Sequence, residues 1–111
     1  MNSNEMFKII DTIAKHYGIN NQKEMAIEEM SELIQAIQKL KRCPMSVESY
    51  RKTLDNLVEE IADVTIMMYQ LMTLVNKRRV HEVMEQKLNR QLKRIEEEKS
   101  VKVEVVEDDK D

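Results

Sequence analysis

Two short stretches of this sequence place acidic residues in the same unusual pattern. The first, AIEEMSELIQAI over residues 26–37, contains Glu28, Glu29 and Glu32. The second, NLVEEIADVTIMM over residues 56–68, contains Glu59, Glu60 and Asp63. Both stretches have helical apolar spacing, and at about 100° per residue each acidic set spans an arc of roughly 100° that overlaps the apolar stripe. Partly buried carboxylates that occur twice in one pattern indicate a site.

The two acidic sets lie at nearly equal distances from the clearest break in the chain. Glu29 precedes Pro44 by 15 residues, and Glu60 follows it by 16. An antiparallel helical hairpin that turns at Pro44 therefore brings the two sets to similar heights. Facing carboxylates in a half-buried site cannot all stay ionised without counter-charge, so either some are protonated or cations lie between them. An all-oxygen ligand set without His or Cys selects a hard ion, Mg²⁺ or Mn²⁺.

Two other interpretations of these acids stay open. A single EExxE motif is most often a solvated helix face, although a matched second motif weakens that interpretation. Salt bridges to basic residues of another helix are the other alternative. Salt bridges within one helix do not explain the acids, because none of the six has a Lys or Arg at i±3 or i±4. A di-iron bundle is set aside, since it needs Glu-x-x-His pairs and the residues three before His16 and His81 are Ile13 and Arg78.

The whole composition favours helices. The chain has 111 residues, of which 35% are charged, with one Gly and one Pro. Such a chain forms one small domain with few helix breakers. We predict an all-α fold of four helices, covering approximately residues 4–17, 21–42, 47–76 and 81–99.

The predicted helix ends rest on particular residues. Gly18 is placed to stop the first helix, and Asn21 and Glu24 have capping-box spacing for the second. Pro44 disfavours helix at the residue before it, and Ser46 is placed to cap the third helix.

The third predicted helix is apolar on nearly every side from Ile61 to Val75. A helix of this kind must be covered on all sides, and three other helices of a short chain do not suffice. We therefore predict a homo-oligomer, most simply a two-fold dimer.

Charge is distributed unevenly along the chain. Residues 77–94 hold seven Lys or Arg against two Glu, and residues 101–111 hold five acids against two Lys. The basic segment either meets an anion or is an ordinary solvated helix face. We expect residues 100–111 to be an acidic, disordered tail, although Val101, Val103 and Val105 alternate as in a short strand.

The lone Cys43, the lack of an apolar leader and the lack of a long apolar run predict a cytoplasmic protein. We expect neither nucleic acid nor a membrane as its partner.

The two acidic motifs together resemble those of the MazG-like, all-α nucleoside triphosphate pyrophosphohydrolases, whose relatives include dimeric dUTPases and dCTP pyrophosphatases. The matching stretches are Glu28-Glu29-Met30-Ser31-Glu32-Leu33 and Glu60-Ile61-Ala62-Asp63-Val64. Tyr17-Gly18 with Gln22, and Lys87-Leu88-Asn89-Arg90-Gln91, also resemble compact members. The similarity spans about residues 7–95. It implies a domain over residues 1–99 that is a four-helix MazG-like bundle completed by oligomerisation, as a dimer or a dimer of dimers.

The resemblance also implies roles for particular residues. The implied Mg²⁺ ligands, with Mn²⁺ as a substitute, are Glu29, Glu32, Glu60 and Asp63. Glu28 is either a further ligand or orients the attacking water. The implied catalytic residues are therefore Glu28 and Glu29. Glu59 either supports the metal ligands from outside or is exposed. Lys87 and Asn89 are the nearest counterparts of a phosphate-contacting Lys and Asn, although their spacing is tighter than the family's Lys-x-x-x-Asn. Arg90, Lys93 and Arg94 are alternative phosphate contacts, and a solvated basic face is the other interpretation of all five.

The implied reaction is hydrolysis of an NTP or dNTP to the monophosphate and pyrophosphate. The sequence has no Ser-His-Asp set and no GxxxxGK[ST] loop, so the chemistry would depend on the metal cluster. The alternative is a non-catalytic helical dimerisation or regulatory protein, which the apolar third helix supports equally well. A degenerate member that binds nucleotides without turnover is disfavoured by the intact acids.

Overall fold

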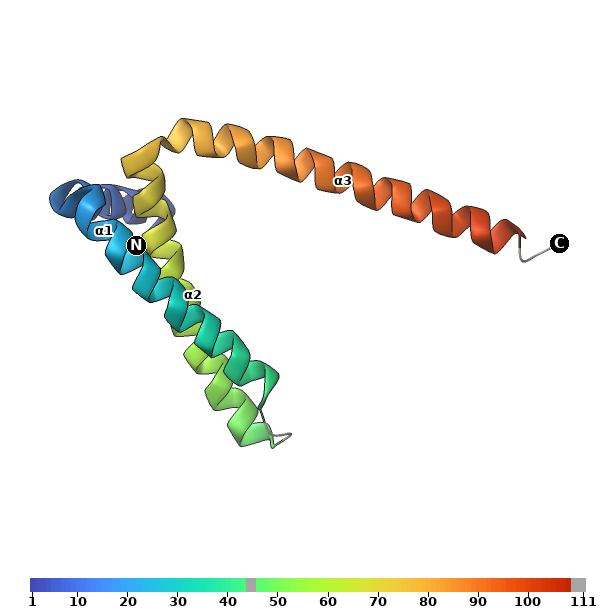
Figure 1. Cartoon of the computed structure of the whole chain (residues 1–111), viewed down its shortest axis with the longest axis horizontal. Helices are drawn as coiled ribbons and strands as arrows, with labels where there is room; N and C mark the ends of the chain where they lie inside the picture. Colours follow the sequence, from blue (N-terminus) through green and yellow to red (C-terminus); the bar gives the residue numbers. More distant parts are fainter. Residues whose placement is uncertain (44–45, 109–111) are drawn as a thin grey trace. The chain divides into compact units, whose positions relative to one another are not determined.

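The computed structural model describes residues 1–43 and 46–108, with side chains described as far as Lys102. The described residues form three helices, α1 (Ser3–Lys41), α2 (Val47–Val75) and α3 (Lys77–Asp108), and no strand (Figure 1). The predicted all-α fold is confirmed. The chain divides into two compact units, Met1–Asn76 and Lys77–Asp111, and each is described by itself. Among the described helices none has an apolar stretch of the length that crossing a bilayer requires.

The first two predicted helices form the single element α1, which bends at Gly18. The backbone of Gly18 has φ 80° and ψ 168°, a conformation that is essentially restricted to glycine. No atom lies within 4 Å of where a Cβ would be, so backbone conformation rather than crowding selects glycine here. The Asn21 amide donates to the Tyr17 carbonyl at 2.8 Å. This bond satisfies a carbonyl at the end of residues 3–17, and the hydrogen bonds of the described residues include none between Asn21 and Glu24, so the predicted capping box is not formed.

The start of α2 is as predicted. Ser46 is its N-cap, and the Ser46 hydroxyl accepts a hydrogen bond from the Ser49 backbone N–H at 3.3 Å. The helix ends at Val75, one residue before the predicted end. Helix α1 ends at Lys41, and the predicted break at Pro44 lies outside the described residues.

Residues 19–41 of α1 run antiparallel beside α2, as Figure 1 shows for the first unit. We call the side chains between the two helices the seam. On α1 the seam is Gln22, Ala26, Glu29, Leu33, Ala36 and Leu40, and on α2 it is Ser49, Thr53, Asn56, Glu60, Val64 and Met67, all buried or half-buried. The α1 set alternates steps of four and three residues, and the α2 set also consists of steps of three and four, with two consecutive steps of four from Asn56 to Val64. Such steps are the spacing of a coiled-coil interface. The small Ala26 and Ala36 allow the helices to approach closely.

The two outer sides of this hairpin differ in chemistry. Two antiparallel helices are related by a two-fold axis normal to their common plane, so equal steps from the seam lie on the same side of the pair. Nine of the twelve residues that follow a seam residue form an apolar face, made of Ile27, Met30, Ile34, Ile37, Tyr50, Leu54, Leu57, Ile61 and Met68. The other three are Lys23, Lys41 and Thr65. Residues that precede a seam residue lie on the opposite side of the hairpin. Four of them are acidic, and we call this side the acid face: Glu28, Glu32, Glu59 and Asp63.

Residues 3–17 of α1 pack against the C-terminal half of α2. The rings of Phe7 and Tyr69 meet edge to face with centroids 4.9 Å apart, and the Thr73 hydroxyl donates to Asp11 Oδ1 at 2.6 Å. Just beyond the bend, the buried Gln22 amide donates to the buried Gln70 side-chain carbonyl at 2.5 Å. These contacts fix the end of the hairpin that lies away from the turn.

Helix α3 is longer than predicted at both ends. It begins at Lys77, where the guanidinium groups of Arg78 and Arg79 lie 3.3 and 3.4 Å from the Glu82 carboxylate. It continues to Asp108, so the predicted end at Lys99 is not a boundary in the structure, and residues 109–111 lie outside the described part. The alternating valines at the C-terminal end form helix rather than a strand. No partner strand exists in the described chain, and the local Glu and Lys residues favour helix.

Candidate functional site

Three of the predicted ligands come together in the hairpin. Carboxylate oxygens of Glu29, Glu60 and Asp63 lie within 4.8 Å of one another. Glu29 and Glu60 are seam residues on opposite helices, while Asp63 follows Glu60 by one turn on the acid face. The cluster forms because α1 and α2 each place an acid where a coiled-coil seam normally has an apolar residue.

Two oxygen atoms of this cluster have no partner. Oε2 of Glu29 and Oε2 of Glu60 are buried and make no hydrogen bond. Buried polar atoms in folded proteins are nearly always hydrogen-bonded, so each exception needs a physical explanation. Either a proton on one of these carboxyl groups or a cation between them would satisfy these atoms.

The electrostatic environment opposes ionisation of both seam carboxyl groups. Burial raises the pKa of Glu29, and the charges of Asp63, Glu32, Glu60 and Glu28 raise it further. Burial is also the largest cause of the raised pKa of Glu60. The nearby carboxyl groups of Glu32, Asp63 and Glu59 raise it further. The protein without a cation therefore holds protons in its seam more readily than isolated glutamates do.

Salt bridges do not neutralise this cluster. Ion pairs among the described residues include that of Lys52 with Glu48 and those of Arg78 and Arg79 with Glu82. None of the six acids of the doubled motif takes part in them. In the part of the chain that the structure describes, the salt-bridge interpretation of the motif is therefore not supported.

The other acids of the motif lie around the three-residue cluster. Glu32 is exposed and contributes to the raised pKa of Glu60, and Glu28 is exposed and contributes to the raised pKa of Glu29. Glu59 is exposed, which is one of the two positions predicted for it. Glu28 and Glu32 both precede a seam residue, so they lie on the same side of the hairpin as Asp63.

The donor set fits a small hard cation. Two ligand atoms on opposite sides of one Mg²⁺ lie about 4.2 Å apart, twice the usual Mg–O distance. Of three oxygens that bind one octahedral Mg²⁺ at most one pair is opposite, and the remaining pairs are about 3.0 Å apart. The oxygens of Glu29, Glu60 and Asp63, which lie within 4.8 Å of one another, therefore need to approach by up to roughly 0.6 to 1.8 Å to share one ion. All candidate ligands are carboxylates, which suit Mg²⁺ and Mn²⁺ rather than softer metals.

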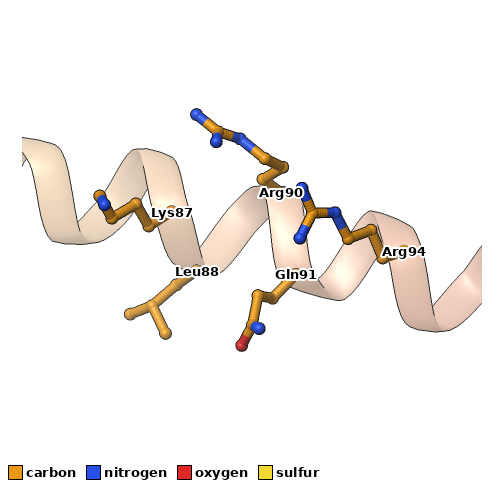
Figure 2. Close-up of a pocket in the computed structure, with 5 residues that line it drawn as sticks. All are labelled: Lys87, Leu88, Arg90, Gln91 and Arg94. Atoms are coloured by element: carbon orange, nitrogen blue, oxygen red, sulfur yellow. The ribbon is translucent and has the colours of Figure 1, made fainter.

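The predicted phosphate-binding residues lie on α3. Lys87, Arg90 and Arg94 line a shallow cavity of about 310 Å³ together with Leu88 and Gln91. Figure 2 shows that all five come from this one helix, with Leu88 and Gln91 extending to one side and Arg90 to the other.

Asn89 and Lys93 are not part of this cavity. Two helical positions such as Lys87 and Asn89 are about 200° apart, so their side chains leave α3 in nearly opposite directions. The basic cluster belongs to the second unit and is described by itself.

The hydrogen bond between the Gln22 and Gln70 side chains is not predicted from the sequence. Gln22 belongs to the stretches that carry the family resemblance, and Gln70 belongs to no motif. The pair lies one heptad from the acids, since Gln22 precedes Glu29 by seven residues and Gln70 follows Asp63 by seven. That equal spacing is the one signal in the sequence from which the pairing can be anticipated.

Comparison of this chain with protein-family models, with curated proteins and with solved structures gave no match. The resemblance to MazG-like enzymes thus rests on the sequence motifs alone and stays a prediction.

Proposed function

We propose that this protein is a Mg²⁺-dependent nucleoside triphosphate pyrophosphohydrolase that cleaves an NTP or dNTP to the monophosphate and pyrophosphate. One observation carries the proposal. Two helices place Glu29 and Glu60 face to face in a seam, with unpartnered buried oxygens and with Asp63 beside them. Such a cluster is unfavourable on its own and is stabilised by a divalent cation.

Glu29, Glu60 and Asp63 hold the metal in this proposal, and Glu32, adjacent to Glu60, completes the set. Bound Mg²⁺ supplies charge neutralisation for the triphosphate and lowers the pKa of water. Glu28 is exposed next to Glu29 and orients the attacking water. The water oxygen bonds to the α-phosphorus, the bond to the α–β bridging oxygen breaks, and pyrophosphate leaves with that oxygen. The water's proton passes to a carboxylate and then to solvent.

The α3 cluster of Lys87, Arg90 and Arg94 is a proposed phosphate-binding site of the second unit, taken by itself. Lys87 supplies a compact positive charge, while Arg90 and Arg94 supply planar groups that bind phosphate in a bidentate manner. All three are exposed side chains that line one cavity, which supports their acting together. Asn89 and Lys93 remain alternative contacts from other sides of the helix.

We further propose that the apolar face joins two copies of the chain, as a dimer or as a dimer of dimers. Ile27 and Ile34 on α1 expose 62% and 57% of their surface, and Ile61 on α2 exposes 49%. An apolar face that spans both helices of a hairpin is typical of an association surface. The proposed location is the cytoplasm, where the thiol of Cys43 stays reduced.

Ile34→Lys is expected to weaken the oligomer at least roughly a hundredfold, because association would bury an unpaired ammonium group. Sedimentation velocity over a range of protein concentrations measures this effect. Gln35→Lys is the matched control, since Gln35 is exposed and precedes a seam residue, on the opposite side of the hairpin. Equal association of both variants with the wild type would show that the apolar face is not the interface.

The same exposed apolar face favours a second candidate function, a non-catalytic dimerisation or regulatory protein. Self-association is common to both candidates, so it does not separate them. Turnover does, because the second candidate releases no product from any nucleotide.

The direct test is a release assay on the full chain. With Mg²⁺ and each common NTP and dNTP in turn, we expect pyrophosphate rather than orthophosphate, and we expect none in EDTA. Mn²⁺ should restore release. Orthophosphate as the first product would show that a bond other than the one between the α- and β-phosphates is cleaved. No product with any nucleotide would favour the non-catalytic, regulatory function.

A further inference from the structure

Residues 3–17 of α1 and the C-terminal half of α2 enclose a groove of about 230 Å³. Its lining residues are Ser3, Met6, Phe7, Ile10, Thr65, Ile66 and Tyr69. None of them is charged, and most of the lining is apolar. The whole groove lies within the first compact unit. It arises because the bend at Gly18 turns the start of α1 across α2, where Phe7 meets Tyr69 edge to face.

The groove begins one helical turn beyond the acid cluster. Ile66 precedes the seam residue Met67 just as Asp63 precedes Val64, so Ile66 continues the acid face. Asp63, Ile66 and Tyr69 are spaced by three residues and form one ridge on α2, with about 4.5 Å of rise per step. A molecule that reaches from Asp63 along this ridge enters the groove at Ile66.

The chemistry of the walls defines what the groove can bind. Uncharged, largely apolar walls do not suit a phosphate group. The volume is below the roughly 300–1,000 Å³ of pockets that bury a whole drug-sized ligand, so it suits one ring system. The Phe7 ring is 37% exposed and offers an aromatic surface for stacking, while Ser3 and Tyr69 supply hydroxyl groups at the edge. These features match a planar heteroaromatic ring with a polar edge.

We propose that this groove binds the nucleobase of the substrate whose triphosphate lies at Glu29, Glu60 and Asp63. The inference rests on the proposed function, and it assigns the base to the contact between residues 3–17 and α2. Ile66 separates the base from the metal ligands.

Filling the groove tests this assignment by kinetics. Ile66→Trp is expected to raise KM for the preferred nucleotide roughly tenfold or more and to leave kcat within about twofold, because it removes stacking space and not a metal ligand. Arg51→Trp, at an exposed position of α2 outside the groove, is the matched control and should keep the wild-type KM. If Ile66→Trp loses its helical circular dichroism, Phe7→Leu serves instead, since it keeps apolar bulk but removes the aromatic face.

A binding measurement separates the groove from the reaction. Phe7 is the only phenylalanine, so its ring signals in NMR spectra need no assignment by mutation. In metal-free protein we expect a saturable shift of these signals with at least one of adenosine, guanosine, cytidine, uridine and thymidine, and no shift in Ile66→Trp.

Each outcome bears on one proposal or the other. Pyrophosphate release with an unchanged KM in Ile66→Trp, and with no Phe7 shift, overturns the groove and leaves the hydrolase. A saturable Phe7 shift without any release supports the groove and overturns the hydrolase. A changed oligomeric state in Ile66→Trp but not in Arg51→Trp would mark the groove as a subunit contact and overturn the base assignment.

Discussion

Glu29→Gln is expected to lower pyrophosphate release at least about a hundredfold, with the fold unchanged. Loss of a residue that merely supports a metal ligand commonly costs ten- to a hundredfold in affinity or activity, so loss of a ligand itself reaches at least the upper end of that range. The amide keeps the shape of the carboxylate but removes its charge. Asp63→Asn should act similarly, since its carboxylate lies within 4.8 Å of the other two.

The matched controls are Glu24→Gln on α1 and Asp55→Asn on α2, which remove the same charges at exposed positions outside the cluster. Both should keep wild-type activity. Calorimetric titration with Mg²⁺ in the presence of nucleotide should show weakened binding in the site variants only. Loss of helical structure in Glu29→Gln and Asp63→Asn would instead identify structural roles for these acids.

The metal-free protein is expected to become more stable as the pH falls from neutrality. Burial and neighbouring charge raise the pKa of Glu29 and of Glu60 above the ordinary value of 4.5. Between that value and the raised pKa, the folded state binds more protons than the unfolded state. The free energy of unfolding therefore decreases as the pH rises through this window. Below 4.5 the two carboxyl groups are protonated in the folded and in the unfolded state, so the cost of ionising them in the seam is absent. Urea denaturation in EDTA at several pH values measures the trend.

A double variant isolates the contribution of these two groups. Glu29→Gln with Glu60→Gln should be more stable than the metal-free wild type at neutral pH and should lose this part of the pH dependence. Saturating Mg²⁺ should stabilise the wild type by about 2.7 kcal/mol at one hundred times its Kd, and should do little for the double variant. An identical pH profile for wild type and double variant would show that the seam carboxyls do not titrate as the geometry indicates.

Local features of the chain were predictable because they depend on neighbouring residues. Ser46 caps α2 since its hydroxyl needs only the N–H three residues ahead, and Gly18 marks the bend since its backbone needs a positive φ. The end of α3 was not predictable in the same way. Alternating valines are typical of a strand, but the described chain offers no partner strand and the local Glu and Lys residues favour helix.

The sequence by itself determined that two helices carry matched acidic triplets at nearly equal distances from Pro44, because helical periodicity and residue counts depend on nothing else. Tertiary structure decided which of those acids meet. The seam runs through Glu29 and Glu60, so these two lose solvent while Glu28 and Glu59, one residue away, stay exposed. It also decided that Phe7 meets Tyr69 across 62 residues of chain, because that contact depends on the direction α1 takes at its bend.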